Sequence, residues 1–213
     1  GFETLKIKVG LNPAEDIQRL KAIREAVGDS ISILSDANQG WDAKSALQII
    51  DSLAAQNLGI AMVEQPVKAW DYANLKYVRD NSRIPIYADE SAFNLRDVSK
   101  IIQAQMADGI NIKLMKSGGL YAARPIYDLA TSHNLPCMAG CMLESPIGLA
   151  AMAAFVVGKS NIKFVDLDPI AMIKSNPVVG GVRLDGATLH LSTGAGLGIE
   201  NIQGLIPVVT IGA

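Results

Sequence analysis

A short strand-like segment followed by a longer helix-like segment recurs along most of this chain. The predicted strands are short apolar runs at 5–9, 31–36, 60–66, 84–90, 109–114, 135–142 and 161–168. The predicted helices between them, with apolar residues three and four apart, are 13–28, 42–57, 71–82, 94–106, 120–134 and 146–158. This order favours parallel strands joined by crossover helices, so we expect an α/β fold, a parallel (β/α) barrel.

Composition and charge limit the kinds of molecule that this protein is expected to bind. The 213 residues suit one domain, and 49% hydrophobic content is enough for a large core. The net charge of −2 gives no electrostatic reason to expect a nucleic-acid or membrane partner, and the apolar run 148–158 is too short to span a bilayer. Two cysteines are too few for a disulfide scaffold, so we expect reduced thiols and a cytoplasmic protein.

Charged residues stand at the ends of successive predicted strands, in a position that is otherwise apolar. They are Lys8, Asp36, Glu64, Asp89 and Lys113. Each lies about one strand plus one helix further along the chain than the one before it. In a closed barrel these strand ends meet at one mouth, where barrel active sites are built. The sequence therefore predicts one polar cleft containing all five side chains.

A metal ion is the expected neighbour of the three carboxylates. Crowded carboxylates repel one another and are costly to bury, and a divalent cation removes that cost. Oxygen ligands with positions left open suit Mg²⁺ or Mn²⁺ better than Zn²⁺. With only two histidines and two cysteines, the chain has no ligand set for zinc.

The first strand carries two lysines on one face. Lys6 and Lys8 are two residues apart, so in a strand they point the same way. A neighbouring like charge and partial burial both lower the pKa of a lysine, towards the range of a general base. With Lys113 on the other side of a metal ion, the arrangement suits removal of a proton next to a carboxylate, whose developing charge the metal stabilises.

Simpler structural roles stay open for these residues. Lys6 and Lys8 could be solvated lysines of an edge strand. Asp36 could form a local turn, and Asp89 or its neighbour Glu90 could cap the following helix. Lys113 could be a surface lysine, and Lys116 is expected in the loop after the fifth strand.

Five motifs together resemble the barrel of the enolase superfamily, in its muconate-lactonizing subgroup. They are KIK (6–8), SDANQGW (35–41), VEQP (63–66), ADES (88–91) and NIKLMKSGG (111–119). The resemblance covers nearly the whole chain and implies a barrel of the (β/α)7β type. It implies that the metal ligands are Asp36, Glu64 and Asp89. It also implies an acid/base pair, Lys8 and Lys113, with Lys6 tuning Lys8 and holding the substrate carboxylate.

A later motif narrows the resemblance to one substrate class. Asp166 and Asp168, in the DLD sequence, share a face if the last strand continues through them. This pair resembles the D-x-D of the dipeptide epimerases, the L-Ala-D/L-Glu epimerase type, where it binds the substrate amine. In the CMLES segment, Glu144 is a candidate for substrate contact or a structural role, and Met142 for the side-chain pocket.

The resemblance implies an isomerase that inverts the α-carbon of the C-terminal residue of a dipeptide such as Ala-Glu. Its two bases would act through an Mg²⁺-stabilised enediolate. Other enzymes of the subgroup remain alternatives: a muconate cycloisomerase, an N-acylamino acid racemase or an o-succinylbenzoate synthase. A catalytically silent barrel is a further alternative of a different class.

The resemblance also implies that part of the family's structure lies outside this chain. Family members have an N-terminal capping domain and a first barrel strand before the KIK strand. We therefore expect a companion N-terminal segment or chain, and a homo-oligomer. The barrel is expected over residues 1–180. A C-terminal β element is expected over 181–213, with a hairpin turn at Asp185 and Gly186.

Overall fold

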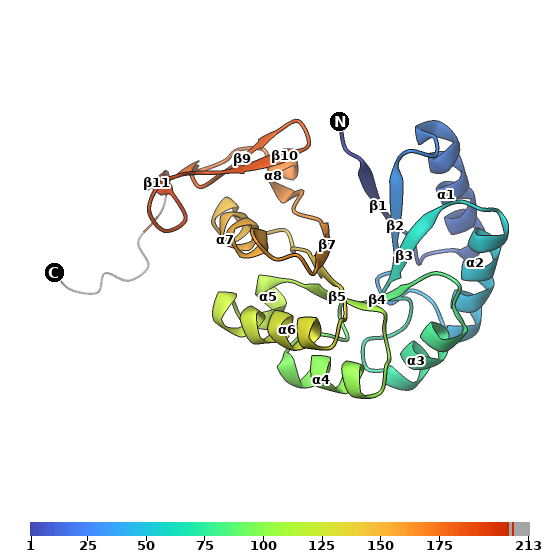
Figure 1. Cartoon of the computed structure of the whole chain (residues 1–213). Helices are drawn as coiled ribbons and strands as arrows, with labels where there is room; N and C mark the ends of the chain where they lie inside the picture. Colours follow the sequence, from blue (N-terminus) through green and yellow to red (C-terminus); the bar gives the residue numbers. More distant parts are fainter. Residues whose placement is uncertain (205, 207–213) are drawn as a thin grey trace.

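The computed structural model describes residues 1–204 and 206, and shows one curled parallel sheet with helices around its outer side (Figure 1). The seven strands lie in chain order in the sheet: β1 (Thr4–Lys8), β2 (Ser32–Asp36), β3 (Ile60–Glu64), β4 (Ile86–Ala88), β5 (Gly109–Ile112), β6 (Cys137–Ala139) and β7 (Ile162–Val165). All neighbouring strands pair in parallel. The predicted α/β architecture is confirmed.

Six of the helices connect successive strands: α1 (Pro13–Val27), α2 (Ala43–Ala55), α3 (Tyr72–Asn81), α4 (Leu95–Gln103), α6 (Leu120–Ser132) and α7 (Pro146–Val156). Two short helices, α5 (Leu114–Ser117) and α8 (Pro169–Met172), directly follow strands near the carboxyl edge of the sheet. Among the described residues, no helix combines the length and the apolar character needed to cross a bilayer.

The sheet curls without closing. The order of paired strands runs from β1 to β7, and within the described residues no pairing joins these two end strands. A side-chain contact crosses the opening instead, because Lys6 Nζ donates to Asp166 Oδ2 at 3.0 Å. The expected barrel is therefore present as an open, seven-stranded form.

Apolar side chains form two cores, one on each face of the sheet. The larger core lies between the sheet and the helices and includes Ile33, Val63 and Ile110. The smaller core lines the concave face and consists of Leu34, Met62, Tyr87 and Met138. Alternation along each strand explains the division, because neighbouring residues point to opposite faces. Residues two positions beyond the inner core therefore reach the mouth of the barrel.

Most of the connecting helices begin at a side chain that accepts hydrogen bonds from the first turn. These N-cap residues are Asn12, Asp42, Asp71, Asn94 and Ser145. Because Asn94 caps α4, neither Asp89 nor Glu90 is needed for that role. The helix-cap alternative for these two acidic residues is therefore wrong.

The chain after α8 forms two small antiparallel sheets that are separate from the parallel sheet (Figure 1), and β9 and β10 lie against α7. One pairs β8 (Val178–Gly180) with β11 (Ile199–Ile202), and the other pairs β9 (Val182–Asp185) with β10 (Thr188–Leu191). The expected hairpin at Asp185 and Gly186 is confirmed, with Gly186 at a φ of 58° that favours glycine. Pairing crosses the expected boundary at residue 180, and residues 205 and 207–213 of the expected C-terminal element lie outside the described residues. The division into two parts stays a prediction.

A buried arginine ties α1 to the strands that follow it. Arg24 Nε donates to Leu58 O at 2.9 Å, and its terminal nitrogens donate to the carbonyls of Gly28, Ile31 and Gly59. Replacing Arg24 by methionine leaves these acceptors without the guanidinium, and a buried unsatisfied group costs about 1–3 kcal/mol. We expect the free energy of unfolding in urea to fall by about 3 kcal/mol.

The matched control is Arg124→Met. The Arg124 side chain is 80% exposed and lies 3.7 Å from Asp128, an arrangement that contributes about 0–1 kcal/mol. We expect its unfolding midpoint to stay close to that of the unchanged protein. Equal losses in the two variants would contradict the role given to Arg24.

Candidate functional site

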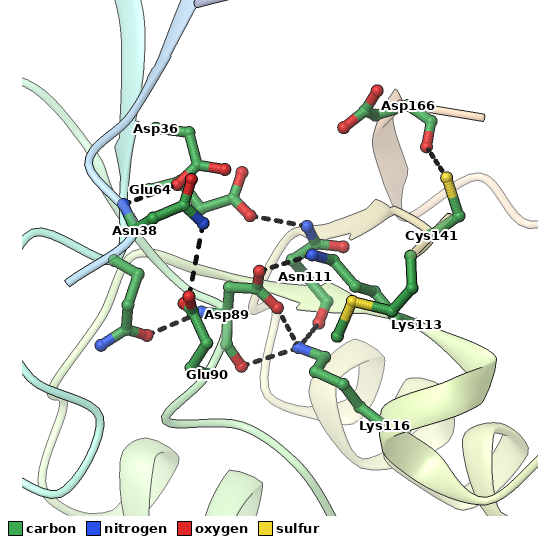
Figure 2. A network of polar contacts seen from close by, with 12 residues as sticks. Asp36, Asn38, Glu64, Asp89, Glu90, Asn111, Lys113, Lys116, Cys141 and Asp166 are labelled. Carbon is green, nitrogen blue, oxygen red and sulfur yellow. Dashed lines mark hydrogen bonds and ion pairs between the residues drawn. The ribbon is translucent and has the colours of Figure 1, made fainter. Parts of the chain in front are cut away.

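The five predicted residues lie at neighbouring strand ends. Lys8, Asp36 and Glu64 are the last residues of β1, β2 and β3, while Asp89 and Lys113 directly follow β4 and β5. Figure 2 shows that the three carboxylates and Lys113 face a common region. The strand order places Lys8 and Lys113 at opposite ends of the row of carboxylates.

Two of the carboxylates converge on Lys6. Its Nζ lies 3.0 Å from Asp36 Oδ2 and 2.9 Å from Glu64 Oε2. Lys8 Nζ donates to the same Asp36 oxygen at 2.6 Å, but its side chain is 62% exposed. Asp36 Oδ1 accepts from the backbone N–H of Asn38, so the local turn considered for Asp36 is present together with its lysine contacts.

The third carboxylate, Asp89, contacts two other lysines. Lys113 Nζ donates to Asp89 Oδ2 at 2.6 Å, and Lys116 Nζ donates to Asp89 Oδ1. Lys116 Nζ also donates to the backbone oxygens of Asp89 and Asn111, both at 2.7 Å. The expectation that Lys116 lies in a loop is wrong: it belongs to α5, and its side chain is fully buried.

Asn111 is a site residue to which the sequence analysis gave no role. Its Nδ2 donates to Glu64 Oε1 at 2.8 Å, which links β5 to β3 across β4. A Cβ at Gly140 would lie 2.5 Å from Asn111 Oδ1, so the glycine that directly follows β6 makes room for this amide. The signal was in the alternation of β5, which puts Asn111 on the same face as Lys113.

The loops that carry Lys8 and Asp36 pack backbone against backbone. A Cβ at Gly10 would lie 2.2 Å from Ala37 O, at a φ of 104°. The buried Asp16 accepts from Gly10 N at 2.8 Å and from Trp41 Nε1 at 3.2 Å. These contacts fix the two loops against each other and against α1.

Burial and charge shift the pKa values around Glu64. Burial, together with the charges of Asp36 and Asp89, raises the pKa of Glu64 to about 7, although Lys6 opposes the shift. Burial would lower the pKa of Lys6, but Glu64, Asp36 and Asp166 outweigh it and raise this pKa well above its usual range. The surrounding carboxylates therefore determine the direction of the Lys6 pKa shift.

Burial and neighbouring charges also shift the pKa values of Asp89 and its two lysine partners. Burial would raise the pKa of Asp89, but Lys116 and Lys113 hold it well below its usual range. Burial lowers the pKa of Lys116. The pKa of Lys113 is raised, because Asp89 outweighs the effect of burial. Asp89 is therefore an ionised carboxylate at neutral pH.

The two aspartates of the DLD sequence follow β7 instead of continuing it. Asp166 contacts Lys6, Leu167 is buried, and Asp168 is exposed with helical backbone angles at the start of α8. Burial and the charge of Asp166 raise the pKa of Asp168. The expectation that the pair shares one face of a strand is therefore wrong in its geometry, because β7 ends at Val165.

The CMLES segment turns its acidic side chain inward. Glu144 is buried, and its Oε1 accepts from the backbone N–H of Met142 at 3.2 Å. Its Oε2 lies close to Gly148, where a Cβ would come within 2.6 Å. These contacts are of the structural kind left open by the sequence. Met142 is 37% exposed, and its role in a substrate pocket stays a prediction.

The donor set fits a magnesium ion by its chemistry. Within the described residues, no three His, Cys, Asp or Glu side chains form a group that could hold a metal ion as they stand. Asp89 faces Lys113 and Lys116 in this arrangement. Nevertheless, Glu64 Oε2 is buried without a hydrogen bond, although it lies 2.9 Å from Lys6 Nζ. Buried carboxylate oxygens at adjacent strand ends are the ligands that Mg²⁺ prefers.

The open parallel barrel, with carboxylates and lysines at the carboxyl ends of its strands, defines a class of β/α-barrel proteins whose polar site lies at that edge. Residues 1–203 match the family described as Enolase C-terminal domain-like, and the chain belongs to this family. The resemblance to the enolase superfamily that the sequence motifs indicated is thereby confirmed.

Three relatives illustrate the similarity. The L-Ala-D/L-Glu epimerase of Clostridium acetobutylicum is 43% identical over 203 residues, covering 95% of this chain and 57% of that protein. A substrate-liganded structure of the Bacillus subtilis L-Ala-D/L-Glu epimerase superposes with a TM-score of 0.93 at 43% identity, covering 95% of this chain and 56% of that one. The Enterococcus faecalis V583 dipeptide epimerase, complexed with Mg and L-Leu-L-Tyr, gives 0.89 at 45% identity, covering 94% and 57%.

The chain thus spans little more than half the length of these relatives. The family match covers residues 1–203, and the site residues described above all lie within that range.

Proposed function

We propose that this chain forms the barrel of a Mg²⁺-dependent dipeptide epimerase, which inverts the α-carbon of the C-terminal residue of Ala-Glu or a similar dipeptide. The observation that carries the proposal is the buried row of carboxylates with Lys8 at one end and Lys113 at the other. The names of the relatives support the substrate class, and the Enterococcus faecalis structure contains both Mg and a dipeptide.

Asp36, Glu64 and Asp89 would hold the ion. To do so, Asp89 would give up one of its lysine contacts and bind the metal instead. A bound Mg²⁺, or Mn²⁺, would stabilise negative charge on the substrate carboxylate as the α-proton leaves. Lys8 and Lys113 would exchange that proton from opposite sides. One lysine takes the proton as general base, and the other returns a proton to the far face as general acid.

The groups near β7 would bind the rest of the dipeptide. Lys6 would contact the substrate carboxylate, while Asp166 and Asp168 would pair with the N-terminal ammonium group, as charge-assisted hydrogen bonds of this kind are strong. Met142 would contribute to the pocket for the substrate side chain, and Glu144 would bind substrate or hold its loop in place.

A companion segment would complete the site. Among the described residues, the outer edges of β1 and β7 have no paired strand, and proteins normally pair or cover such edges. A further N-terminal segment or chain would supply a strand there and a cap over the mouth. Assembly into a homo-oligomer stays a prediction.

Proton exchange tests the proposal directly. The longest form of the protein that its gene encodes is incubated with Mg²⁺ in D₂O, with L-Ala-L-Glu and other dipeptides, and ¹H NMR follows the α-proton of the C-terminal residue. We expect deuterium incorporation together with inversion. Exchange on N-acyl amino acids but not on dipeptides would identify an N-acylamino acid racemase instead. A protein that exchanges neither and binds no Mg²⁺ would fit the catalytically silent alternative.

Replacing Asp166 by asparagine is expected to weaken dipeptide binding. Losing a hydrogen bond between charged groups costs about 1.5–3 kcal/mol, so we expect KM to rise by about 10- to 100-fold. Mg²⁺ affinity is expected to stay within about twofold, because Asp166 is not among the expected ligands. The control is Asp185→Asn in the exposed hairpin, where KM should not change. An equal loss of Mg²⁺ affinity and dipeptide affinity in the Asp166 variant would contradict the assignment.

A further inference from the structure

Gln65, which directly follows Glu64, has a fully satisfied side-chain amide in the buried interior. Its Nε2 donates to Val67 O at 2.9 Å and to Ser91 Oγ at 2.8 Å. Its Oε1 accepts from Asp89 N at 2.9 Å and from Ser91 N at 3.0 Å. A glutamine amide has two donor hydrogens and an oxygen with two lone pairs, so every position is used.

These bonds continue the pairing of β3 with β4 beyond the backbone ladder. The two strands pair at two register positions, Val63 with Ile86 and Glu64 with Tyr87. The backbone N–H of Gln65 then donates to Tyr87 O at 2.9 Å. Two residues after Tyr87, just past the end of β4, the backbone N–H of Asp89 has its partner in the Gln65 side chain. The amide therefore connects the strand ends that carry Glu64 and Asp89.

The backbone of Gln65 is unfavourable for its residue type. Its φ of 38° lies in the left-handed region, which costs a residue other than glycine of the order of 1–3 kcal/mol. Glycine would remove that cost but would provide no amide. The presence of glutamine at this strained position is explained if the side chain itself is needed.

We propose that Gln65 is a positioning residue, whose amide fixes the carboxylates of Glu64 and Asp89 relative to each other so that they can share one cation. This inference rests on the proposed function of the carboxylate row. Lys113 and Lys116 hold the Asp89 side chain, and Gln65 holds its backbone. The amide thus sets where the strand ends, and the lysines set where the carboxylate points.

Gln65→Met, which keeps the length of the side chain and removes all four hydrogen bonds, tests this role. Isothermal titration with Mg²⁺ alone, without substrate, is expected to show a Kd about 10- to 100-fold higher than that of the unchanged protein. Gln65→Gly is expected to show the same loss, although it relieves the backbone strain. A wild-type Kd in either folded variant would overturn the proposal, because a purely structural role lowers the melting temperature without changing Mg²⁺ affinity.

Gln39→Met is the matched control. Gln39 also has a left-handed φ, 67°, in the loop after β2, and its Oε1 accepts a single hydrogen bond, from Ala69 N at 2.9 Å. Its Kd for Mg²⁺ is expected to stay within about twofold. An equal loss in this variant would mean that general loosening of the loops, not the Gln65 amide, weakens binding, and would overturn the proposal.

A milder variant covers the case in which the Gln65 variants do not fold. Ser91→Ala removes the hydroxyl that accepts from Gln65 and donates to Ala69 O, but keeps the bond from Asp89 N to Gln65. We expect a Kd between those of the unchanged protein and Gln65→Met; an unchanged Kd would count against the proposal.

Amide hydrogen exchange separates this inference from the proposed function. The backbone N–H of Asp89 is expected to exchange about tenfold faster in Ser91→Ala or Gln65→Met than in the unchanged protein, because its acceptor is loosened or lost. If the unchanged protein binds no Mg²⁺, the proposed function fails. Faster exchange of the Asp89 N–H in the variants would then still show that the Gln65 amide connects the ends of β3 and β4. Unchanged exchange would overturn this connection as well.

Discussion

Replacing Lys113 by methionine is expected to stop inversion of the dipeptide, with kcat/KM for epimerisation falling by about 10³-fold. Methionine is close to lysine in length but carries no group that can accept or return a proton. Lys113 is buried beside Asp89, at the opposite end of the carboxylate row from Lys8. The loss should therefore come from the chemistry of one face of the substrate.

The two lysine variants are expected to differ in which epimer still exchanges its proton. With one base removed, the remaining lysine can reach the α-proton of only one epimer. Lys8→Met and Lys113→Met should therefore each exchange one epimer in D₂O without inverting it, and the two variants should retain opposite epimers. ¹H NMR of L-Ala-L-Glu and L-Ala-D-Glu, run separately with each variant, measures this directly.

Lys76→Met provides the control. Lys76 pairs with Asp80 on the exposed surface of α3, and its loss should leave both rates unchanged. Two outcomes would contradict the assignment of the bases: exchange of the same epimer by both lysine variants, or inversion that survives in either of them.

The fold could be predicted from the sequence because its signals are local. Each strand and helix has its own apolar period, and parallel order follows from their alternation. The positions of Lys8, Asp36 and Glu64 at strand ends could also be predicted, because the charge interrupts an apolar run. The number of paired strands and the open edge could not be read from periodicity, since they depend on which segments meet.

The contacts within the site were much harder to predict. Lys116 lies one helical turn after Lys113, and only the short α5 turns its side chain back towards Asp89. The Gln65 side chain makes four hydrogen bonds to three residues that lie beyond β3 or in another segment, Val67, Asp89 and Ser91. Asp168 departs from strand alternation because β7 ends before it. In each case the deciding contact joins residues far apart in the sequence or depends on where an element ends.

The direction of the lysine pKa shifts also depends on these long-range contacts. Burial alone would lower the pKa of both Lys6 and Lys113. The carboxylates brought against them from other strands have the larger effect. A strand pattern shows which side chains share a face, but not how many opposite charges approach that face from its neighbours.

Replacing Glu64 by glutamine is expected to weaken Mg²⁺ binding by at least about 100-fold, the upper end of the loss seen when only a supporting residue is removed. Glutamine keeps the shape of the side chain but has no charge. The buried oxygen Oε2, which has no hydrogen bond in the unchanged protein, is replaced either by an amide nitrogen or by a neutral amide oxygen. Titration calorimetry with Mg²⁺ alone measures the change. Glu90→Gln is the control, since we expect Glu90 to be a neighbour of the site and not a ligand.

The Glu64→Gln variant is also expected to be more stable than the unchanged protein when both are free of metal at pH 8. The pKa of Glu64 is raised from 4.5 to about 7 in the folded chain. The folded state therefore binds the proton more tightly, and stability falls as the pH rises from about 4.5 through 7. For a pKa shift of this size, the free energy of unfolding falls by about 3 kcal/mol over that pH range. Glutamine removes that cost.

Urea unfolding in EDTA at pH 5 and at pH 8 checks the sign. Near pH 5 the carboxyl group of the folded protein is protonated, so the two proteins should differ little there. At pH 8 the glutamine variant should unfold at higher urea, and added Mg²⁺ should narrow or reverse the difference by stabilising only the unchanged protein. A glutamine variant that is less stable at pH 8 in EDTA would mean that the ion pair with Lys6 outweighs the burial of Glu64. A metal ligand is expected to destabilise the metal-free fold when it is buried and ionised, and a bound cation is expected to restore that stability. A structural salt bridge would stabilise the fold without a cation.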